Sequence, residues 1–509
     1  MKPVLNNFII KPALLVFSRV NSGQPLRAFL ARITQYKLLL LLELLITGIS
    51  IRSQAEILND SIKVVTFAAF YDQIKANHPV VRQAALLPKQ AQQELRIARG
   101  YFDPQAISYY DRKDFKDQLY YENWNSMVKV PLWFGADLKA GYERNKGVNV
   151  NPEVKTPAAG LTYAGISLPI GQGWLIDQRR ATLRQAQLLI NAAEADKIKI
   201  INKLLLEASK DYWDWVLAYQ RWQLYQTAYN LSEVRYRGVS ERARYGDLAA
   251  IDTVEARVDL INRQQLLQQS LTEFQNSRLV VSNYLWTSDQ NPVELVSSAV
   301  PAFNESDLNL IPADTLQQLF RFAQENHPEL RKLDFKYKQL EIERRLAADK
   351  FKPKLNLEYN FLRQDFGLPV ERLNSTYFLN NYKLGVSFSY PLLLRSERGK
   401  WQLTRYKLTE TDLALTQTQR DITTALQTTY NELQMLAAQI NTQETLVSQA
   451  DILRRGEQTR FENGESSLFL VNTREMNLIN QNVKLWELKT KYVKSIALLY
   501  WSAGTMDNW

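Results

Sequence analysis

The chain has 509 residues, of which 45% are hydrophobic, a formal net charge of +10 and a pI near 9.3. Residues 1–55 hold seven basic residues and one acidic residue, which leaves 56 basic and 52 acidic residues for the rest and no lysine- or arginine-rich run. Nucleic-acid binding, which the pI first suggests, thereby loses its main support. Because cysteine is absent, neither disulfides nor a lipid-modified N-terminal cysteine are expected.

The first 55 residues have the form of a signal peptide. Scattered basic residues lead into the apolar run KLLLLLELLITGIS (37–50), and the small-x-small sequence SQA then precedes Glu56. The alternative is an uncleaved membrane anchor, but the apolar run is shorter than the roughly 20 residues that a helix needs to cross a bilayer. We therefore expect an exported protein.

The two histidines of the chain mark an internal duplication. His78 and His327 each stand in the tripeptide NHP, and the sequences that begin there (77–104 and 326–353) match at a constant offset of 249. A repeat at a fixed offset indicates two copies of one structural unit. The predicted segments are a signal peptide at 1–55, a first repeat at 56–290, a linker rich in Pro, Ser and Asn at 291–314, and a second repeat at 315–509.

In both copies the NHP motif follows a short predicted helix, at 67–76 and at 316–325. Asn suits a cap or turn, His fills the position after it, and Pro opens the next helix, where its missing N–H costs nothing. We therefore interpret the histidines as structural. Because they occupy equivalent places in two copies, His78 and His327 are not expected to share a metal ion.

Strands are predicted after the NHP helices. In LNLEYNFL (355–362) and KLGVSFSYP (383–391), aliphatic and aromatic residues alternate with small and polar ones. An apolar face opposite a polar face is typical of a barrel with lipid outside and water inside, although a soluble sandwich alternates as well. Aromatic residues gather near the predicted strands, as an interfacial girdle would: Trp124, Trp133, Trp174, Tyr359, Tyr377, Tyr382 and Tyr390.

Very long helices follow the strands, at about 177–245 and 397–461, and each would approach ~100 Å in length. Their apolar positions recur every three or four residues, which predicts left-handed coiled-coil packing. These positions are Ile201, Leu205, Ala208, Tyr212, Trp215, Tyr219 and Trp222, and Ile422, Leu426, Tyr430, Leu433, Leu436 and Ile440. Each long helix ends at a glycine, Gly246 or Gly464, after which a shorter helix returns.

This order of elements resembles that of the TolC-like outer-membrane efflux proteins. The resemblance covers residues 66–501 and rests on the two tandem copies, the NHP motifs, the Pro-Leu turns between strand and helix, and the helix–Gly–helix tips. It implies an α+β membrane protein, a tandem repeat of helix, strands, long helix and helix. Three copies would form an outer-membrane β-barrel continued by a long periplasmic coiled-coil barrel.

The resemblance also implies a function and partners. The homotrimer would be the exit duct of a tripartite efflux or secretion system, in contact with outer-membrane lipid and passively conducting substrates from the periplasm to the outside. Its inner end would dock onto a periplasmic adaptor protein and an inner-membrane transporter of the RND, ABC or MFS type. The chain holds no energy-coupling motif, so the work would come from that transporter.

The number of strands is open at one place. Few strands per chain cannot close a barrel, and free strand edges are not tolerated in lipid, so chains must pool their strands. Four per chain would give twelve in a trimer. However, 65 residues separate Pro104 from Pro169, against 38 between Pro353 and Pro391. The excess, at about 120–144, would be an added membrane hairpin or an extended outer loop, and the loop is our expectation.

The resemblance assigns functional residues to the helix tips. The adaptor-docking tips would be Gly246, Asp247, Leu248 and Ala249, and Gly464, Glu465, Ser466 and Ser467. The periplasmic aperture would lie at Asp252, Phe469, Leu470 and Thr473. Family members often carry acidic rings and a Tyr/Arg latch at the second tip, where this chain has Phe461, Ser466, Leu470 and Thr473. An ionic latch is therefore in doubt, and Leu470 would either close the aperture with Phe469 or be an ordinary core residue.

An enzyme is not expected. The sequence has no Gly-rich phosphate loop and no Ser-His-Asp arrangement, and two histidines without cysteine cannot furnish the usual zinc ligand sets, so neither metal nor cofactor is predicted. The sequence GQG (171–173) is too short for a nucleotide motif. The rival non-enzymatic function is a soluble periplasmic coiled-coil scaffold or adaptor without a membrane barrel.

Overall fold

Two very long helices organise the chain. The helix α5 (Gln178–Arg244) has 67 residues and α10 (Arg395–Glu462) has 68, so each is about 100 Å long. The computed structural model describes residues 64–308, 311–364 and 380–506, all within the unit Val64–Trp509. The signal peptide expected at 1–55 and the girdle residue Tyr377 lie outside the described residues.

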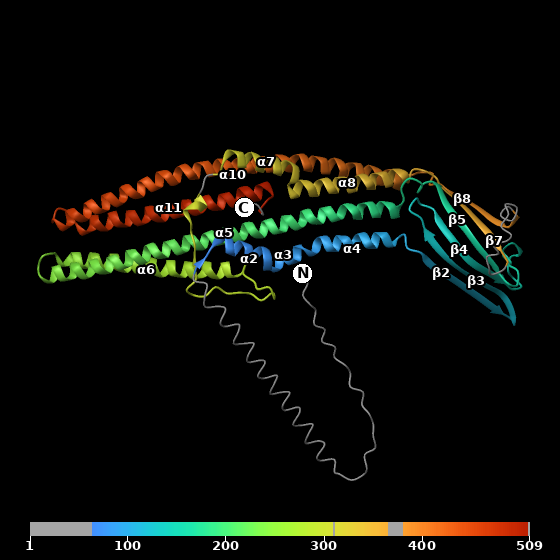
Figure 1. The fold of residues 1–509 in the computed structure, drawn as a ribbon, viewed down its shortest axis with the longest axis horizontal. Helices are drawn as coiled ribbons and strands as arrows, with labels where there is room; N and C mark the ends of the chain where they lie inside the picture. Colours follow the sequence, from blue (N-terminus) through green and yellow to red (C-terminus); the bar gives the residue numbers. More distant parts are fainter. Residues whose placement is uncertain (1–63, 309–310, 365–379, 507–509) are drawn as a thin grey trace, which may run out of the picture. The chain divides into compact units, whose positions relative to one another are not determined.

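Each long helix turns back at a glycine into a shorter antiparallel helix, and the four helices run side by side (Figure 1). The first hairpin pairs α5 with α6 (Ala250–Ser282), and the second pairs α10 with α11 (Leu468–Ala503). Both predicted helix–Gly–helix segments are thus confirmed. The remaining helices are α2 (Phe67–Asn77), α3 (Pro79–Ala84), α4 (Leu86–Gly100), α7 (Ala313–Asn326), α8 (Pro328–Asp349) and the 3-10 turns η1 (Pro152–Val154) and η2 (Glu305–Leu308).

The core lies where the two hairpins meet the NHP helices and the connection between the copies. The short strands β1 (Val64–Val65) and β6 (Val300–Pro301) pair in parallel, and the hydroxyl of Tyr212 lies 2.9 Å from the carbonyl oxygens of Val65 and Ala302. The predicted heptad positions are confirmed as core: the fully or nearly fully buried ones are Leu205, Ala208, Tyr212, Trp215, Leu426, Leu433, Leu436 and Ile440.

The NHP motifs have a role that differs in one detail from the prediction. The Nδ1 atom of His78 accepts a hydrogen bond of 3.2 Å from the Val80 N–H, and Nδ1 of His327 accepts one of 3.2 Å from the Glu329 N–H. Histidine, and not asparagine, is therefore the N-cap of α3 and of α8, because the proline that follows it leaves the next N–H for the imidazole to satisfy. Both rings are buried.

A six-stranded antiparallel sheet lies at the end of the helices that is remote from the glycine turns (Figure 1). Its strand order is β2-β3-β4-β5-β7-β8. The bounds are β2 (Gln105–Phe115), β3 (Gln118–Pro131), β4 (Asp137–Lys146), β5 (Leu161–Gly171), β7 (Lys354–Arg363) and β8 (Tyr382–Ser389). The strands predicted in the second copy are confirmed.

The prediction of an outer loop at 120–144 is wrong. This segment forms most of β3 and β4, which lie inside the sheet between β2 and β5. Lys116 and Asp117, both with positive φ (52° and 58°), make the two-residue turn from β2 to β3, a geometry that matches the twist of the strands it joins. Within these strands, the backbone groups that an exposed loop would leave to water can form ladder hydrogen bonds with the neighbouring strands.

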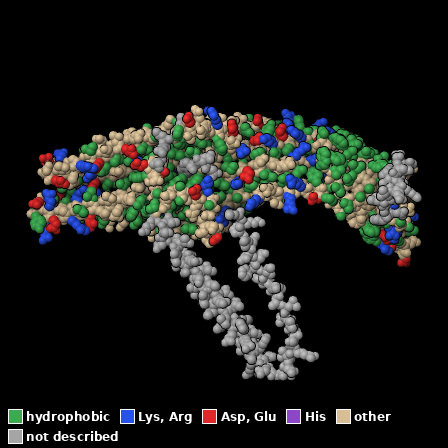
Figure 2. All heavy atoms as spheres, in the orientation of Figure 1, with side chains coloured by type: hydrophobic (Ala, Val, Ile, Leu, Met, Phe, Trp, Pro, Cys, Tyr) green, Lys and Arg blue, Asp and Glu red, His purple; other side chains and the backbone are tan. Residues whose placement is uncertain are grey.

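The sheet has one apolar and one polar face, and the pairing register aligns the residues of each face from strand to strand. The apolar face includes Tyr110, Trp124, Val128, Leu138, Ile170, Leu384, Val386 and Phe388, all of them exposed. The polar face includes Asn125, Lys129, Lys139, Glu143, Ser167, Glu358, Asn360 and Lys383. Figure 2 shows hydrophobic side chains gathered over the sheet. Among the described helices, none combines the length and hydropathy needed to cross a membrane.

Candidate functional site

The tips of the two hairpins are built alike. At the first, the N–H of Gly246 bonds to the carbonyl of Ala243 (3.1 Å) and that of Asp247 to the carbonyl of Arg242 (2.9 Å). At the second, Gly464 and Glu465 repeat both bonds, at 3.1 and 2.8 Å, with Phe461 and Arg460. This pair of bonds is the Schellman motif, which requires a left-handed residue at the glycine position. The φ angles of Gly246 and Gly464, +85° and +77°, meet that requirement.

Conformation, rather than space, accounts for the two glycines. A Cβ atom added to Gly246 or Gly464 would meet nothing within 4 Å. The remaining predicted docking residues (Asp247, Leu248, Ala249, Glu465, Ser466 and Ser467) complete the two turns, and all but Leu248 and Ser466 are exposed. Ser467 caps α11 through its side chain, which accepts from the Leu470 N–H, whereas Ala249 offers α6 no such bond. The tips therefore present surface for contact.

The predicted aperture residues divide between two helices. Phe469 and Leu470 are 62% and 37% exposed, and Thr473 is exposed with its hydroxyl donating to the Phe469 carbonyl at 2.7 Å. Asp252, in the first turn of α6, is half-buried. Leu470 is therefore not an ordinary core residue within the chain. The neighbouring Leu468 occupies that position instead and packs with Val239 of α5 and Ala256 of α6.

A buried ion network joins the two hairpins between about two and four turns from the tips. The Glu475 carboxylate of α11 accepts from Arg235 of α5 (Oε2–Nη1 2.5 Å) and from Arg263 of α6 (Oε2–Nη2 2.6 Å). Arg263 also pairs with Asp259 (Nε–Oδ2 2.9 Å) and donates to the Ala228 carbonyl. The side chains of Arg263 and Glu475 are only 1% and 5% exposed, so water screens this network poorly.

Electrostatics in this network favour the charged carboxylate at Glu475. Burial by itself raises the pKa of Glu475, but hydrogen bonds and charges from Arg235 and Arg263 outweigh burial and hold the pKa below its ordinary value. At Asp259 burial prevails over the attraction of Arg263, so the pKa of Asp259 is raised. Burial, followed by the nearby Asp252 charge, likewise raises the pKa of Glu255.

Two further ion pairs, which are more exposed to solvent, join α5 and α11 at greater distances from the tips; this contact between α5 and α11 is called the seam. Arg221 binds Glu487 (Nη2–Oε1 2.5 Å), and Asp214 pairs with Lys494. On α5 these residues lie seven residues apart and Arg235 lies fourteen further on, so all three face α11 on the same stripe. The seam thus has one buried clamp near the tips and weaker surface pairs along its length.

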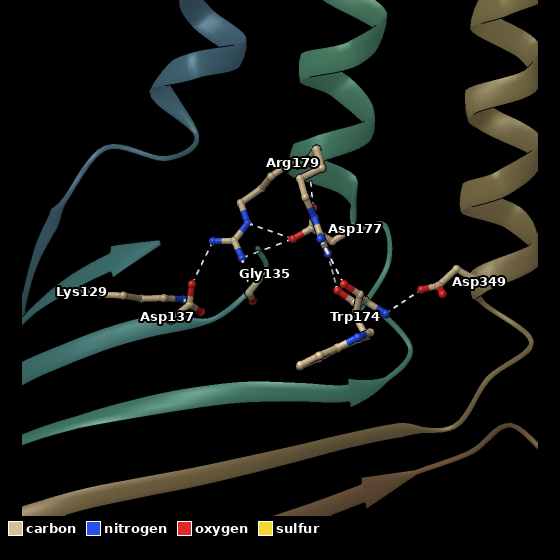
Figure 3. Close-up of polar contacts among 9 residues, drawn as sticks. Lys129, Gly135, Asp137, Trp174, Asp177, Arg179 and Asp349 are labelled. Carbon is tan, nitrogen blue, oxygen red and sulfur yellow. Dashed lines mark hydrogen bonds and ion pairs between the residues drawn. The ribbon is translucent and has the colours of Figure 1, made fainter. Parts of the chain in front are cut away.

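A second polar cluster fixes the junction between sheet and helices (Figure 3). Arg179, at the start of α5, donates to Asp137 of β4 (Nη1–Oδ1 2.9 Å), and Asp137 also pairs with Lys129 of β3 (3.0 Å). Asp177 caps α5 through the Arg180 N–H (2.8 Å). The carboxylate of Asp349, at the end of α8, accepts from the Gly173 N–H at 2.5 Å. The helices of both copies and the β3–β4 hairpin are therefore tied together at one level.

Sequence reasoning missed both clusters. The positions at which family members often carry an ionic latch hold Phe461, Ser466, Leu470 and Thr473 in this chain, whereas the ion network lies about two to four turns further from the tips. A signal was present: the buried residues of α11 include Leu468, Val471, Glu475 and Ile479, spaced 3, 4 and 4, so a carboxylate occupies a position of the apolar stripe. A buried charge on such a stripe needs a partner of opposite charge, and here both partners belong to the first sequence repeat.

The sheet with one exposed apolar face, joined to two antiparallel helical hairpins whose long helices are each about 100 Å, is the fold that the resemblance implied for one chain. Residues 319–505 match the model of the outer membrane efflux protein family. No curated protein sequence matches the chain. The resemblance to the TolC-like outer-membrane efflux proteins, which the order of elements indicated, is confirmed by this match over the second repeat. Members of this family are transport ducts, which confirms the prediction that the chain is not an enzyme.

Solved channels share the fold. The CmeC outer membrane channel of Campylobacter jejuni has 15% sequence identity and a TM-score of 0.60, covering 86% of this chain and 84% of that chain. VceC of Vibrio cholerae has 14% identity and a TM-score of 0.63, covering 86% and 96%. The open state of MtrE from Neisseria gonorrhoeae has 12% identity and a TM-score of 0.62, covering 86% and 88%. At these identities the likeness establishes the fold.

Proposed function

We propose that the chain is the outer-membrane exit duct of a tripartite efflux or secretion system. Three copies join their sheets into one barrel in the outer membrane, and their helical hairpins form a periplasmic tunnel. The tunnel passively conducts substrates from an inner-membrane transporter of the RND, ABC or MFS type, through a periplasmic adaptor, to the outside. The first 55 residues act as the signal peptide for export.

The observation that carries this proposal is the exposed apolar face of the sheet. Leu384, Val386 and Phe388, on one edge strand, are 55%, 64% and 69% exposed, and Tyr110 on the other edge strand is 56% exposed. Exposing such a face to water costs a free energy of roughly 25 cal/mol per Å² of apolar surface, whereas contact with lipid avoids this cost. The opposite face, with Lys139, Glu358 and their neighbours, suits a water-filled lumen. A soluble scaffold has no use for this division.

The repeated architecture supports the proposed segment boundaries as well. Helix, strands, long helix and short helix occur once within 56–290, ending with α5 and α6. They occur again within 315–509, ending with α10 and α11, except that α7 begins two residues earlier, at Ala313. Residues 291–314 link them. We further propose that the tips at Gly246–Ala249 and Gly464–Ser467 dock the adaptor. Asp252, Phe469, Leu470 and Thr473 then face the aperture, and apolar packing of Phe469 and Leu470 from three copies closes it.

Two measurements on the purified protein test the proposal. The mature protein should require detergent for extraction, and in a planar bilayer it should conduct ions, with a larger or more frequent conductance in Leu470→Ser than in the native protein. Solubility without detergent would favour the soluble scaffold instead, and silence of both proteins in the bilayer would contradict the channel.

Docking at the tips is tested in cells. Gly246→Pro and Gly464→Pro should abolish export while leaving the trimer in the outer membrane, because proline fixes φ near −65° and cannot adopt the left-handed turn. Gly456→Ala, at an exposed glycine within α10 where an added Cβ meets nothing within 4 Å, is the control and should export normally. Normal export by both proline variants would remove the tips from the docking surface.

A further inference from the structure

We infer that the barrel of this channel closes with six strands from each copy, eighteen in all, and that the β3–β4 hairpin is part of the membrane wall. The inference rests on the proposed function, since it takes the trimeric channel as given. It concerns which strands form the wall, how copies join, and therefore how wide the outer duct is.

The first argument is the division of faces on the hairpin itself. A hairpin that stood outside the membrane would have no reason to present an apolar face to one side. Yet Val128 of β3 and Leu138 of β4 are 46% and 43% exposed on the same face as Val386 and Phe388 of β8. One lipid-facing surface therefore runs without a break across the inserted strands.

The polar face is equally continuous. Lys139 of β4 forms an ion pair with Glu358 of β7 (Nζ–Oε1 3.0 Å), although β5 lies between these strands. The residue of β5 opposite Lys139 is Gly165, which has no side chain to block the lysine. Asn125 of β3 and Lys383 of β8 line the same hollow. An inserted strand thus contributes charge to the surface that would face the lumen.

The stagger of the six strands corresponds to a strand tilt that is typical of transmembrane barrels. Successive registers place Gln105, the first residue of β2, in the same row as Lys383 of β8, and β8 ends six residues later at Ser389. Both ends lead into helices, so we take them as one level. Six residues at about 3.3 Å over five spacings of about 4.8 Å give a tilt of about 40°. Transmembrane barrels tilt their strands by about 35–45°.

The hairpin is also anchored where the wall meets the tunnel. Asp137, the first residue of β4, is held by Arg179 of α5 and by Lys129 of β3, so the inner turn of the hairpin is tied to the start of the long helix (Figure 3). Strands that belonged to a peripheral loop would not need this attachment. With the hairpin in place, the outer strands of each copy are β2 and β8.

These outer strands fit a second copy of the chain. Among residues 64–308, 311–364 and 380–506, each of β2 and β8 pairs with a strand on one side only. They run in opposite directions, so β8 of one copy and β2 of the next form an antiparallel pair like every other pair in the sheet. An open edge in lipid leaves backbone groups unsatisfied, and this pairing removes both edges from every copy.

The consequence is a wide outer duct. Barrel diameter grows roughly in proportion to strand number, so eighteen strands give about 1.5 times the diameter of a twelve-stranded barrel, and a water-filled channel of porin size. The outer barrel would then pass cargo with about twice the cross-section, and selection by size would be confined to the helix tips.

Disulfide mapping between copies tests the inference on the full-length protein in outer membranes. The chain has no cysteine, so the background is clean. In the first set of variants, Val386→Cys on β8 is combined with one cysteine on β2. In the second set it is combined with one cysteine on β4, because β4 would be the edge strand if β2 and β3 lay outside the wall. All chosen positions share the apolar face: Ala106→Cys, Ser108→Cys or Tyr110→Cys on β2, and Leu138→Cys, Ala140→Cys or Tyr142→Cys on β4.

We expect oxidation to link copies into dimers and trimers through at least one β2 position and through none on β4. Within one copy two strands, β5 and β7, lie between β4 and β8, a separation of about 14 Å that is beyond disulfide reach, so any β4 link joins two copies. Links through β4, or a native trimer that neither set links, would overturn the eighteen-stranded wall and leave the channel intact. A monomer in native mass measurements would instead reject the proposed function.

Discussion

Replacing Glu475 by glutamine removes the charge at the centre of the buried network while keeping the size of the side chain. Arg235 and Arg263 would then face a neutral amide, and Arg263, whose side chain is 1% exposed, would keep only Asp259 as a charged partner. Breaking a buried ion pair by removing one partner costs roughly 3–5 kcal/mol. Because both arginines donate to the same oxygen, Oε2, and an amide oxygen can accept two bonds, glutamine can keep the hydrogen bonds without the charge. We therefore expect a loss at the lower end of that range, about 3 kcal/mol.

This loss falls on the contact between the two hairpins. Arg235 and Arg263 belong to the first hairpin and Glu475 to the second, so the variant weakens the seam next to the tips. Every 1.4 kcal/mol is a factor of ten, so about 3 kcal/mol shifts the balance between joined and separated hairpins about a hundredfold. If separation of the hairpins opens the aperture, open events in a planar bilayer become far more frequent.

Glu487→Gln is the matched control. It lies on the same helix and also pairs with an arginine of α5, Arg221, but the two side chains, of Arg221 and Glu487, are 28% and 35% exposed, and such pairs contribute about 0–1 kcal/mol. Unfolding in urea and single-channel recording are measured for both variants. Equal stability and equal opening in Glu475→Gln and Glu487→Gln would refute the assignment of Glu475 as a clamp.

The pH dependence of the clamp follows from the direction of its pKa shift. Because the pKa of Glu475 in the folded protein is below its unfolded value, the network stabilises the fold fully above about pH 4.3, the ordinary pKa of glutamate. This contribution is lost as the pH falls through the lower, folded pKa. Opening of the native channel should therefore increase only in strong acid, and Glu475→Gln should not respond to the same change.

Three further substitutions test the tips, the caps and the core. Gly464→Ala should cost about 1 kcal/mol through its left-handed backbone alone, since nothing lies within 4 Å of the new methyl, and should speed hydrogen exchange at the second tip. Burial lowers the pKa of His327 to about 4, so the native protein should lose about 3 kcal/mol as the pH falls from 6.5 towards 4. His327→Asn, which can still cap α8, should remove most of that slope in urea unfolding, and an unchanged slope would contradict the titration of His327. Tyr212→Phe should destabilise by about 1–3 kcal/mol, because the Ala302 carbonyl loses the hydroxyl donor, whereas the Val65 carbonyl keeps the Ala302 N–H. An unchanged melting temperature would show that the bond is dispensable.

The sequence by itself determined the elements whose signals are local. Uninterrupted helical patterns of some 65 residues, with a 3-4 apolar spacing at 201–222 and 422–440, predicted the two long helices. A glycine at the end of each predicted a turn that other residues adopt only at a cost. The NHP repeat revealed two copies through the order of residues alone, and alternation identified β7 and β8. From these followed the family, the hairpins and the positions of the tips.

Tertiary structure alone decided how distant segments combine. Alternation in 120–144 was compatible with strands inside the sheet or in a separate hairpin, because the period of a strand does not say which neighbours it pairs with. Only the tertiary structure shows that this segment pairs with β2 and β5. The clamp likewise joins Arg235 and Arg263 to Glu475 across more than 200 residues of chain. Which side chains become partners at such a separation depends on how the two sequence repeats pack against each other, and no local pattern contains that information.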